Sequence, residues 1–245
     1  SPLDKNVIWV GTDDGNIQLT KNGGESWMNC AQFITSMPKN GWVPQIVAGN
    51  FEAGEAFVVV NNYRQNDWKP YLFYTRDFGL TWKSLVDDKK VSGHCLSVVQ
   101  DPIAPKLIFL GTEHGLYISF DMGTSWNKWT YDYPSVPTQD LKIHPREHDL
   151  IIGTFGRAAW IMDNITPLRE FALKGNAMTD KKLVALQTPD AYQANYIQPK
   201  GQRFPADGHY AGDNKDGAVQ LTYYFRIDEE KKEEEKKDAK GKKDK

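Results

Sequence analysis

The stretch Thr75–Trp82 reads TRDFGLTW, and two variants occur in the same chain, TKNGGESW at residues 20–27 and SFDMGTSW at residues 119–126. The Asp or Asn side chain of such a stretch can accept hydrogen bonds from the backbone that follows it, and glycine tolerates a positive φ. The Trp begins the next strand and can pack its ring across the turn. The three copies therefore predict three hairpins that are closed by one kind of turn.

Strand patterns surround these turns. Each turn follows a short alternating strand, at residues 16–20, 71–75 and 116–119, and each of these follows an apolar strand, at residues 7–12, 56–60 and 107–112. A fourth copy, at residues 150–154 and 158–163, lacks the turn motif. Alternation by twos with a repeat of about 40–55 residues is typical of propeller blades, whereas helical repeats would show a 3.6-residue period. The predicted fold class is all-β: a β-propeller of four-stranded antiparallel blades.

The repeat also predicts the organisation of the chain. We expect about four blades within residues 1–172, at residues 1–34, 42–86, 94–129 and 138–171, with the first blade lacking its innermost strand. An open ring would expose apolar blade faces and strand edges. The remaining blades are therefore expected from an upstream part of the same polypeptide or from a partner chain.

After the blades the sequence changes character. Residues 173–217 are polar and punctuated by Pro and Gly, which predicts a connector strapped on the propeller. Residues 218–227 alternate like a strand. Residues 228–245 are almost entirely Glu, Lys and Asp, which predicts a disordered charged tail, with a solvated helix as the alternative.

Composition narrows the classes of function. The chain has 30 basic and 32 acidic residues and a formal charge of −2, without a basic stripe among its aromatic residues, so a nucleic-acid partner is not expected. No apolar run approaches the roughly 20 residues that a transmembrane helix needs. Cys30 and Cys95 form no disulfide framework, and whether they pair is left open.

The turn pattern, with Asn22 replacing Asp in the first copy, resembles the Asp-box or BNR repeat of sialidases, sortilin-type propellers and xyloglucanase-type glycoside hydrolases. More narrowly, the order of the motifs, ending in GTFGRAAWIMDNITPLR at residues 153–169, resembles the C-terminal blades of a bacterial sortilin-like family labelled glycosyl hydrolase-like. The likeness covers about residues 3–172. It implies a propeller of seven or more blades, an immunoglobulin-like domain beginning at residues 218–227, and a secreted, periplasmic or outer-membrane-associated protein.

The residues of the Asp-box turns are predicted to be structural, because a catalytic carboxylate is seldom needed three times. These turn residues are Asn22, Gly24, Trp27, Asp77, Gly79, Trp82, Asp121, Gly123 and Trp126.

The loops that join the second and third strands of each blade should lie on the opposite rim, because antiparallel strands alternate their ends. This rim is the predicted place for a ligand, although its residues equally suit ordinary turns and ion pairs between blades. Arg157, beside Trp160, is expected to tie the last blade to its neighbour. The candidate rim residues are Asp13, Asp14, Tyr63, Arg64, Glu113, His114 and Arg157.

No catalytic residue, cofactor or metal site is predicted, since His94 beside Cys95 lacks a third ligand or an orienting acid at a recognisable spacing. Two hypotheses follow. The first is a non-catalytic secreted or envelope-associated propeller that serves protein or glycan binding and scaffolding within a larger protein or complex. The alternative is a xyloglucanase- or sialidase-like glycoside hydrolase, which would need a carboxylate pair about 5–9.5 Å apart and therefore residues outside this chain.

Overall fold

The computed structural model describes residues 1–191 and 218–227. It divides into two compact units, Ser1–Gly175 and Asn176–Lys245. No helix among the described residues is long and apolar enough to cross a membrane. Most of the predicted connector, from residue 192 to 217, and the predicted charged tail lie outside the described residues.

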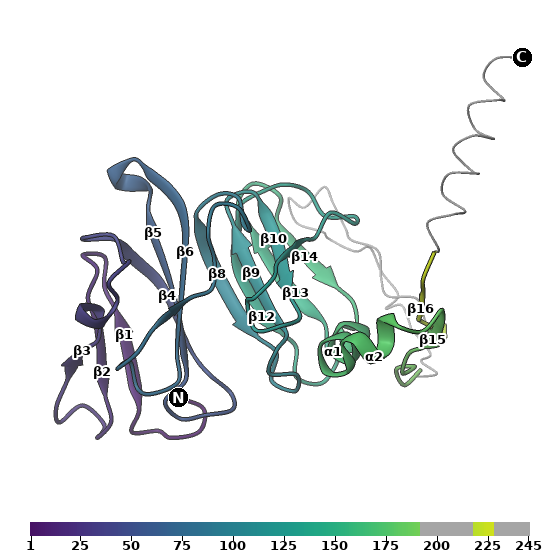
Figure 1. The fold of residues 1–245 in the computed structure, drawn as a ribbon, viewed down its shortest axis with the longest axis horizontal. Coiled ribbons are helices and arrows are strands. Elements are labelled where there is room, and N and C mark those ends of the chain that lie inside the picture. Colours follow the sequence, from purple (N-terminus) through teal and green to yellow (C-terminus); the bar gives the residue numbers. More distant parts are fainter. Residues whose placement is uncertain (192–217, 228–245) are drawn as a thin grey trace, which may run out of the picture. The chain divides into compact units, whose positions relative to one another are not determined.

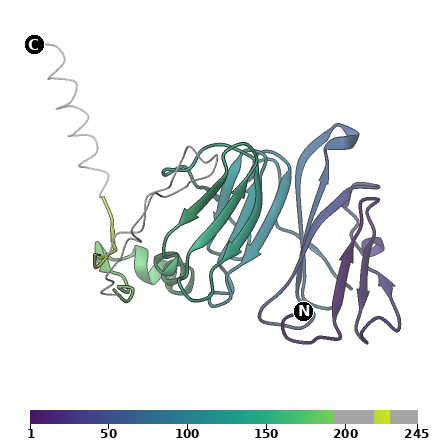
Figure 2. The ribbon, with the colours of Figure 1, turned by 180° about the vertical axis from the view of Figure 1, so that it is seen from behind.

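The first unit consists of four antiparallel sheets that follow one another along the chain (Figure 1, Figure 2). Within each sheet the strands are neighbours in chain order, which is the meander of a propeller blade. The first sheet contains β1 (Ile8–Gly11), β2 (Ile17–Thr20) and β3 (Met28–Asn29). The second contains β4 (Trp42–Ala48), β5 (Ala56–Asn62), β6 (Asp67–Thr75) and β7 (Lys83–Ser84). The third contains β8 (Cys95–Gln100), β9 (Ile108–Thr112), β10 (Gly115–Ser119) and β11 (Asn127–Lys128), and the fourth β12 (Thr138–Ile143), β13 (Leu150–Thr154) and β14 (Ala159–Met162).

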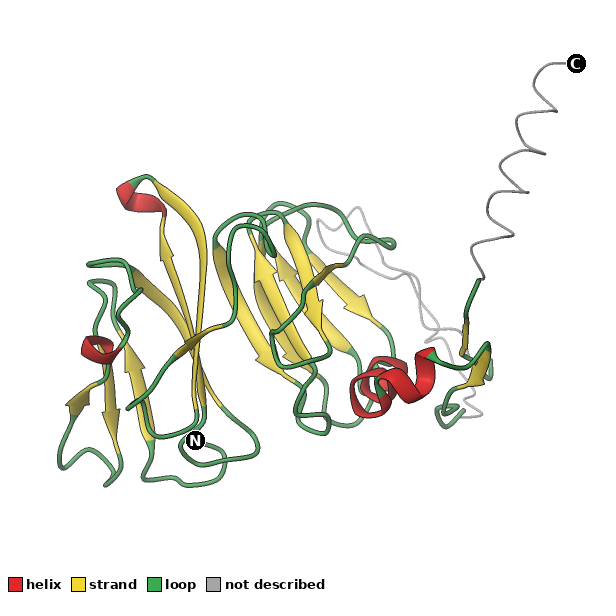
Figure 3. Cartoon of the chain, in the orientation of Figure 1, coloured by secondary structure: helices red, strands yellow, loops and turns green. Residues whose placement is uncertain are grey.

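The structure confirms the predicted all-β fold class, and strands make up most of its regular structure (Figure 3). The second strand of each complete blade is fully buried, since every residue of β5 and of β9 is buried, and in the third sheet every residue of β10 is buried as well. A strand covered on both faces needs a continuous apolar run, which explains AFVVV at 56–60 and IFL at 108–110. Fully burying one such side chain contributes about 1.5–3 kcal/mol. Packing between successive sheets is therefore the main source of stability.

Three clusters of buried side chains fill the spaces between successive sheets. The first joins the sheets that contain Ile17 and Phe73, the second joins those that contain Phe57 and Leu110, and the third joins Phe109 to the fourth sheet. The first and fourth sheets differ from the two inner sheets, because each of them presents apolar strand residues to solvent. Their exposed fractions are 40% for Ile8 and Val10 in β1, 37% for Ile151 in β13 and 62% for Ile161 in β14.

The turns that carry the repeated motif share one hydrogen-bond network. Oδ1 of Asp77 accepts from the Thr75 hydroxyl at 2.9 Å and from the Thr81 amide at 2.9 Å, and Oδ2 accepts from the Thr81 hydroxyl at 2.6 Å. Asp121 accepts the equivalent bonds in the third sheet, and Asn22 accepts two of them in the first. Gly79 has a φ of +76°, and a Cβ there would lie 2.6 Å from the sulfur of Cys30. The turn therefore closes its own hairpin and packs closely against the preceding sheet.

The indoles of the motif also form hydrogen bonds, though not all alike. Trp27 and Trp82 donate to the carbonyl of the glycine three residues earlier, at 3.1 and 2.9 Å. Trp126 donates instead to the carbonyl of Leu85 in the preceding sheet, at 3.0 Å. The predicted packing of the ring across its own turn therefore describes two of the copies, whereas the third Trp links two blades.

The end of the fourth blade differs from the prediction, which extended the blade to residue 171. The sheet ends with β14, and the helix α1 (Thr166–Lys174) follows, with Pro167 in its first turn. Arg169 of this helix is buried and donates from Nε to Oδ2 of Asp101 in the third sheet, at 2.7 Å. The helix thus occupies the chain that would otherwise form an outermost strand.

The second unit is small. It contains the helix α2 (Asn176–Thr179) and a two-stranded antiparallel sheet of β15 (Leu183–Ala185) and β16 (Tyr223–Phe225). Of the strand predicted at residues 218–227, only residues 223–225 form a strand, and its partner is β15. The assignment of this strand to an immunoglobulin-like domain stays a prediction.

Candidate functional site

Two adjoining hollows lie at one end of the blades, where β4, β8 and β12 begin and where β1 and β5 end. The first has a volume of about 330 Å³ and the second about 500 Å³, and Trp42 and Asn61 line both. The first hollow is lined in addition by Asp13, Asp14, Asn40, Asn62, Arg64 and Gln65. The second is lined in addition by Pro44, Gln45, Tyr63, His94, Leu96, Gln139 and Asp140.

The second hollow is built from one irregularity that recurs in three sheets. The innermost strands β4, β8 and β12 each carry one extra residue near their first residues, between Trp42 and Gln45, between Cys95 and Ser97, and between Thr138 and Asp140. Such a bulge leaves a residue outside the ladder and redirects its side chain. Residues of all three bulges line the hollow. The fold therefore brings equivalent positions of three successive blades to one place.

Asn61 is the polar residue that this arrangement leaves without a partner. It is 1% exposed, and neither Oδ1 nor Nδ2 has a hydrogen-bond partner in the described structure. It pairs across the strands with Trp42 at the bulge, as Thr112 pairs with Cys95 and Thr154 with Thr138. An unpaired buried amide costs about 1–3 kcal/mol. The second blade therefore carries a destabilising buried polar group at the end of its second strand.

The second strands of the other three blades end in or beside a threonine, and each of these hydroxyls is bonded within its own loop. Thr12 accepts from the Asn16 amide at 2.9 Å, Thr112 donates to the Gly115 carbonyl at 3.2 Å, and Thr154 donates to a carbonyl four residues later at 2.6 Å. The longer loop of the second blade offers Asn61 no such acceptor or donor. The absence of a partner for Asn61 among the described residues points to a role for this side chain outside the fold.

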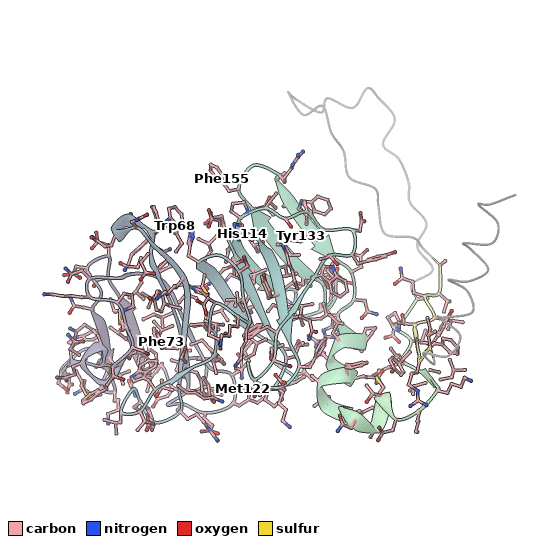
Figure 4. The ribbon with its side chains drawn as sticks, turned by 45° about the horizontal axis from the view of Figure 1, so that its top comes forward. Trp68, Phe73, His114, Met122, Tyr133 and Phe155 are labelled. Atoms are coloured by element: carbon pink, nitrogen blue, oxygen red, sulfur yellow. The ribbon has the colours of Figure 1, made fainter. Side chains whose placement is uncertain are left out.

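Aromatic rings surround the second hollow. The Tyr63 ring stacks on the His94 ring with centroids 5.4 Å apart, and the Trp68 ring meets His94 edge-on at 5.7 Å. The guanidinium of Arg64 lies 4.6 Å from the centroid of the Trp42 ring. Figure 4 shows Trp68 and His114 at the end of the sheets opposite Met122, which lies in a turn of the repeated motif. We call the group of Trp42, Tyr63, Trp68 and His94 the aromatic rim. The aromatic rim and the turns of the repeated motif are thus at opposite ends of the blades.

The charged groups of the first hollow are mostly acidic. Asp13 and Asp14 are exposed, and the Asp14 carboxylate accepts from the Thr12 hydroxyl and from the Asn16 amide nitrogen. The hydrogen bond from Thr12, and then that from Asn16, holds the pKa of Asp14 below its usual value. Asp140 adds a carboxylate to the second hollow, whereas Arg64 is the cation among the lining residues.

His94 connects the aromatic rim to the third sheet. Its Nδ1 lies 3.1 Å from Oε2 of Glu113, and the Nε2 of His114 lies 4.0 Å from the same oxygen. Burial lowers the pKa of His94, although the Glu113 carboxylate opposes this effect. The neutral ring is therefore the favoured form at neutral pH, and it packs between Tyr63 and Trp68.

The structure brings most of the candidate rim residues together, although their role stays a prediction. Asp13, Asp14 and Arg64 line the first hollow and Tyr63 the second. Glu113 and His114 lie beside His94. Arg157 does not belong to this group: its side chain is exposed, with no hydrogen bond or ion pair to another described residue, so the expected tie to the neighbouring blade is not present.

Sequence reasoning missed several lining residues and set His94 aside. The missed lining residues include Trp42, Asn61, Gln139 and Asp140, and Trp68, whose ring contacts His94, was missed as well. One signal was available for Asn61, because the apolar run of the second blade ends in two asparagines where the other blades have Gly-Thr.

Cys30 and Cys95 are both free and buried, which answers the question of their pairing. Burial raises the pKa of Cys30 to about 11 and that of Cys95 to about 12. A thiol with so high a pKa is a poor nucleophile at neutral pH. Among the described residues no three His, Cys, Asp or Glu side chains gather into a cluster that could hold a metal ion.

Comparisons with known proteins identify the fold. No protein-family model and no curated protein match the chain. Among solved structures, the GH74 enzyme of Niastella koreensis is 15% identical, with a TM-score of 0.52 over 65% of this chain and 27% of that one. The GH74 xyloglucanase of Xanthomonas campestris is 16% identical, with a TM-score of 0.49 over 65% and 26%. YCF48 bound to D1 peptide is 16% identical, with a TM-score of 0.49 over 66% and 49%.

The class that these findings define is the β-propeller. At such low identity the likeness shows the fold alone. The chain spans half or less of the length of each of these proteins.

Proposed function

We propose that the chain is the blade-bearing part of a larger non-catalytic β-propeller that binds a protein or glycan ligand at the hollowed rim. The observation that carries this proposal is Asn61, which lines both hollows and whose buried amide has no partner among residues 1–191 and 218–227. A buried polar group that costs stability and has no partner among the described residues is best explained by an external partner. The ligand would supply the donor and the acceptor that the fold lacks.

Further blades are part of the same proposal. The outer faces of the first and fourth sheets expose Ile8, Val10, Ile151 and Ile161, and exposed apolar strands invite pairing and aggregation. Blades from the same polypeptide or from a partner chain would cover them. The turn network around Asp77 and Asp121 supports assigning the motif to the Asp-box of a sortilin-like propeller, and with that resemblance comes a secreted, periplasmic or outer-membrane-associated location.

Binding screens test the proposal. The 245-residue chain and its Asn61→Leu variant are applied to a glycan array and to a library of short blocked peptides. We expect ligands that bind the native chain and lose at least about tenfold in affinity with the variant, because the amide is no longer there to pair. A matched control is Thr112→Val, which removes a buried polar group near the end of the second strand of the third blade, outside both hollows. Ligands that bind both variants as well as the native chain would contradict the assignment of the site.

A glycoside hydrolase remains the second candidate, because Asp13, Asp14 and Asp140 line adjoining hollows. The lowered pKa of Asp14 suits a base or a nucleophile, whereas a general acid needs a raised pKa. The acid would then come from another blade. Turnover of β-glucans or sialosides by the complete propeller, lost in Asp14→Asn or Glu113→Gln, would favour this candidate over the binding role.

A further inference from the structure

The lining of the two hollows carries an excess of negative charge. The first hollow is lined by two carboxylates, Asp13 and Asp14, and by one cation, Arg64, and the second hollow is lined by the carboxylate of Asp140. Arg64 is partly engaged, because its guanidinium lies over the Trp42 ring. Asp13 has no hydrogen bond or ion pair with another described residue, so its carboxylate is available to a ligand. A positively charged group is the complement of this lining.

Asn61 adds a second and independent requirement. A side-chain amide offers one acceptor oxygen and two donor hydrogens, which match the N–H and the C=O of a peptide group. No hydrogen bond from another described residue engages the Asn61 amide, so its donors and its acceptor are unused in the fold. Because Asn61 lines both hollows, a ligand that crosses from one to the other must pass it.

The rim has the composition of a protein-binding surface. Trp, Tyr and Arg are the residues that most often dominate binding energy at protein interfaces. Here Trp42, Tyr63, Trp68 and Arg64 meet at one place, and Trp68 is 50% exposed. Exposed Trp faces also attract cations.

We infer that the two hollows bind an extended peptide segment that carries a lysine or arginine side chain, with a backbone amide of the segment paired to Asn61 and the cation received by Asp13 and Asp14. This inference rests on the proposed binding function and names its ligand. The acidic lining selects the basic side chain, the amide selects the backbone, and the aromatic rim holds the flanking residues.

A peptide library tests this inference on the 245-residue chain. The probe is a positional-scanning library of hexapeptides blocked at both ends, and the best lysine peptide is then compared with its Nε-acetyl-lysine analogue by calorimetry. We expect lysine or arginine to be selected at one position, and the acetylated analogue to bind about tenfold more weakly or worse. Asp13→Asn should weaken binding, and added salt should do the same. Asp88→Asn, the same charge change in the exposed loop after β7, should leave binding unchanged.

Three outcomes would overturn the inference, and they separate it from the proposed function. Selection of neutral or acidic peptides, or of glycans, with binding lost in Asn61→Leu, would refute the basic ligand while the binding site stands. Equal weakening by Asp13→Asn and Asp88→Asn would show that only net charge matters. Absence of any binding that depends on Asn61 would refute both the inference and the proposed function.

Discussion

Replacing Asn61 with leucine should stabilise the chain while it removes ligand binding. Leucine has nearly the shape of asparagine but no polar atoms. The native side chain is 1% exposed, and both of its polar atoms lack partners, so the change removes a cost without removing a hydrogen bond. A polar residue kept at the expense of stability is expected where function requires it.

The magnitude follows from the burial of the amide. An unsatisfied buried polar group costs about 1–3 kcal/mol, and an apolar replacement of the same shape recovers that amount. For a chain of this size, the gain corresponds to a rise in Tm of about 3–9 °C. Asn62 provides the matched control, because its Nδ2 donates to Oδ2 of Asp67 at 3.1 Å. Asn62→Leu breaks that bond and should lower Tm.

Thermal unfolding followed by circular dichroism, together with urea titration, measures both variants against the native chain. The expected order of stability is Asn61→Leu above native above Asn62→Leu. If Asn61→Leu unfolds at a lower temperature than the native chain, the Asn61 amide is paired in solution. The reasoning that assigns it to a ligand would then fail.

Three further results are expected. Arg169→Leu leaves the buried Asp101 carboxylate without its cation and should lower the free energy of unfolding in urea by about 3–5 kcal/mol. The control Arg146→Leu, which breaks an exposed ion pair, should lower it by less than about 1 kcal/mol. Equal losses would contradict the role of the buried pair. Burial acts to raise the pKa of Asp77, but the hydrogen bonds from Thr81, Thr75 and Leu80 together outweigh it and lower that pKa. The stability that this carboxylate contributes is therefore present above about pH 4 and is lost as the pH falls further. Asp77→Asn, which copies the Asn of the first blade, should flatten this loss between pH 6 and pH 3, and an unchanged pH slope would count against the network. Ile161→Lys should reduce self-association of the 245-residue chain in sedimentation without changing Tm. Unaltered sedimentation would show that the chain does not self-associate through the exposed face of the fourth sheet.

The blades were predictable because their signals are local. Buried second strands read as continuous apolar runs, and each hairpin is closed by an Asp or Asn, a Gly and a Trp within eight residues. The helix α1 was missed because the expectation of another blade outweighed a local cue, Pro167 in the first turn of a helix-forming stretch. Tertiary contact also decides this element, since Arg169 is held by Asp101 of another sheet.

The candidate site was only half predictable, for a physical reason. Asp13, Asp14 and Arg64 could be found because they lie in loops after recognisable strands. Asn61 is a candidate because its buried amide has no partner among the described residues, and His94 is one because it packs against aromatic rings of another sheet. Neither an absent hydrogen bond nor a stacking partner leaves a trace in the spacing of residues along the chain.

The bulges at the start of β4, β8 and β12 have a consequence for how such a surface can change. Each places one side chain beyond the ladder, so Pro44, Leu96 and Gln139 can be exchanged while the backbone bonds of their sheets persist. The proposed specificity of the rim could thus be altered one blade at a time, by mutation or by design, with the backbone hydrogen bonds of the sheets retained.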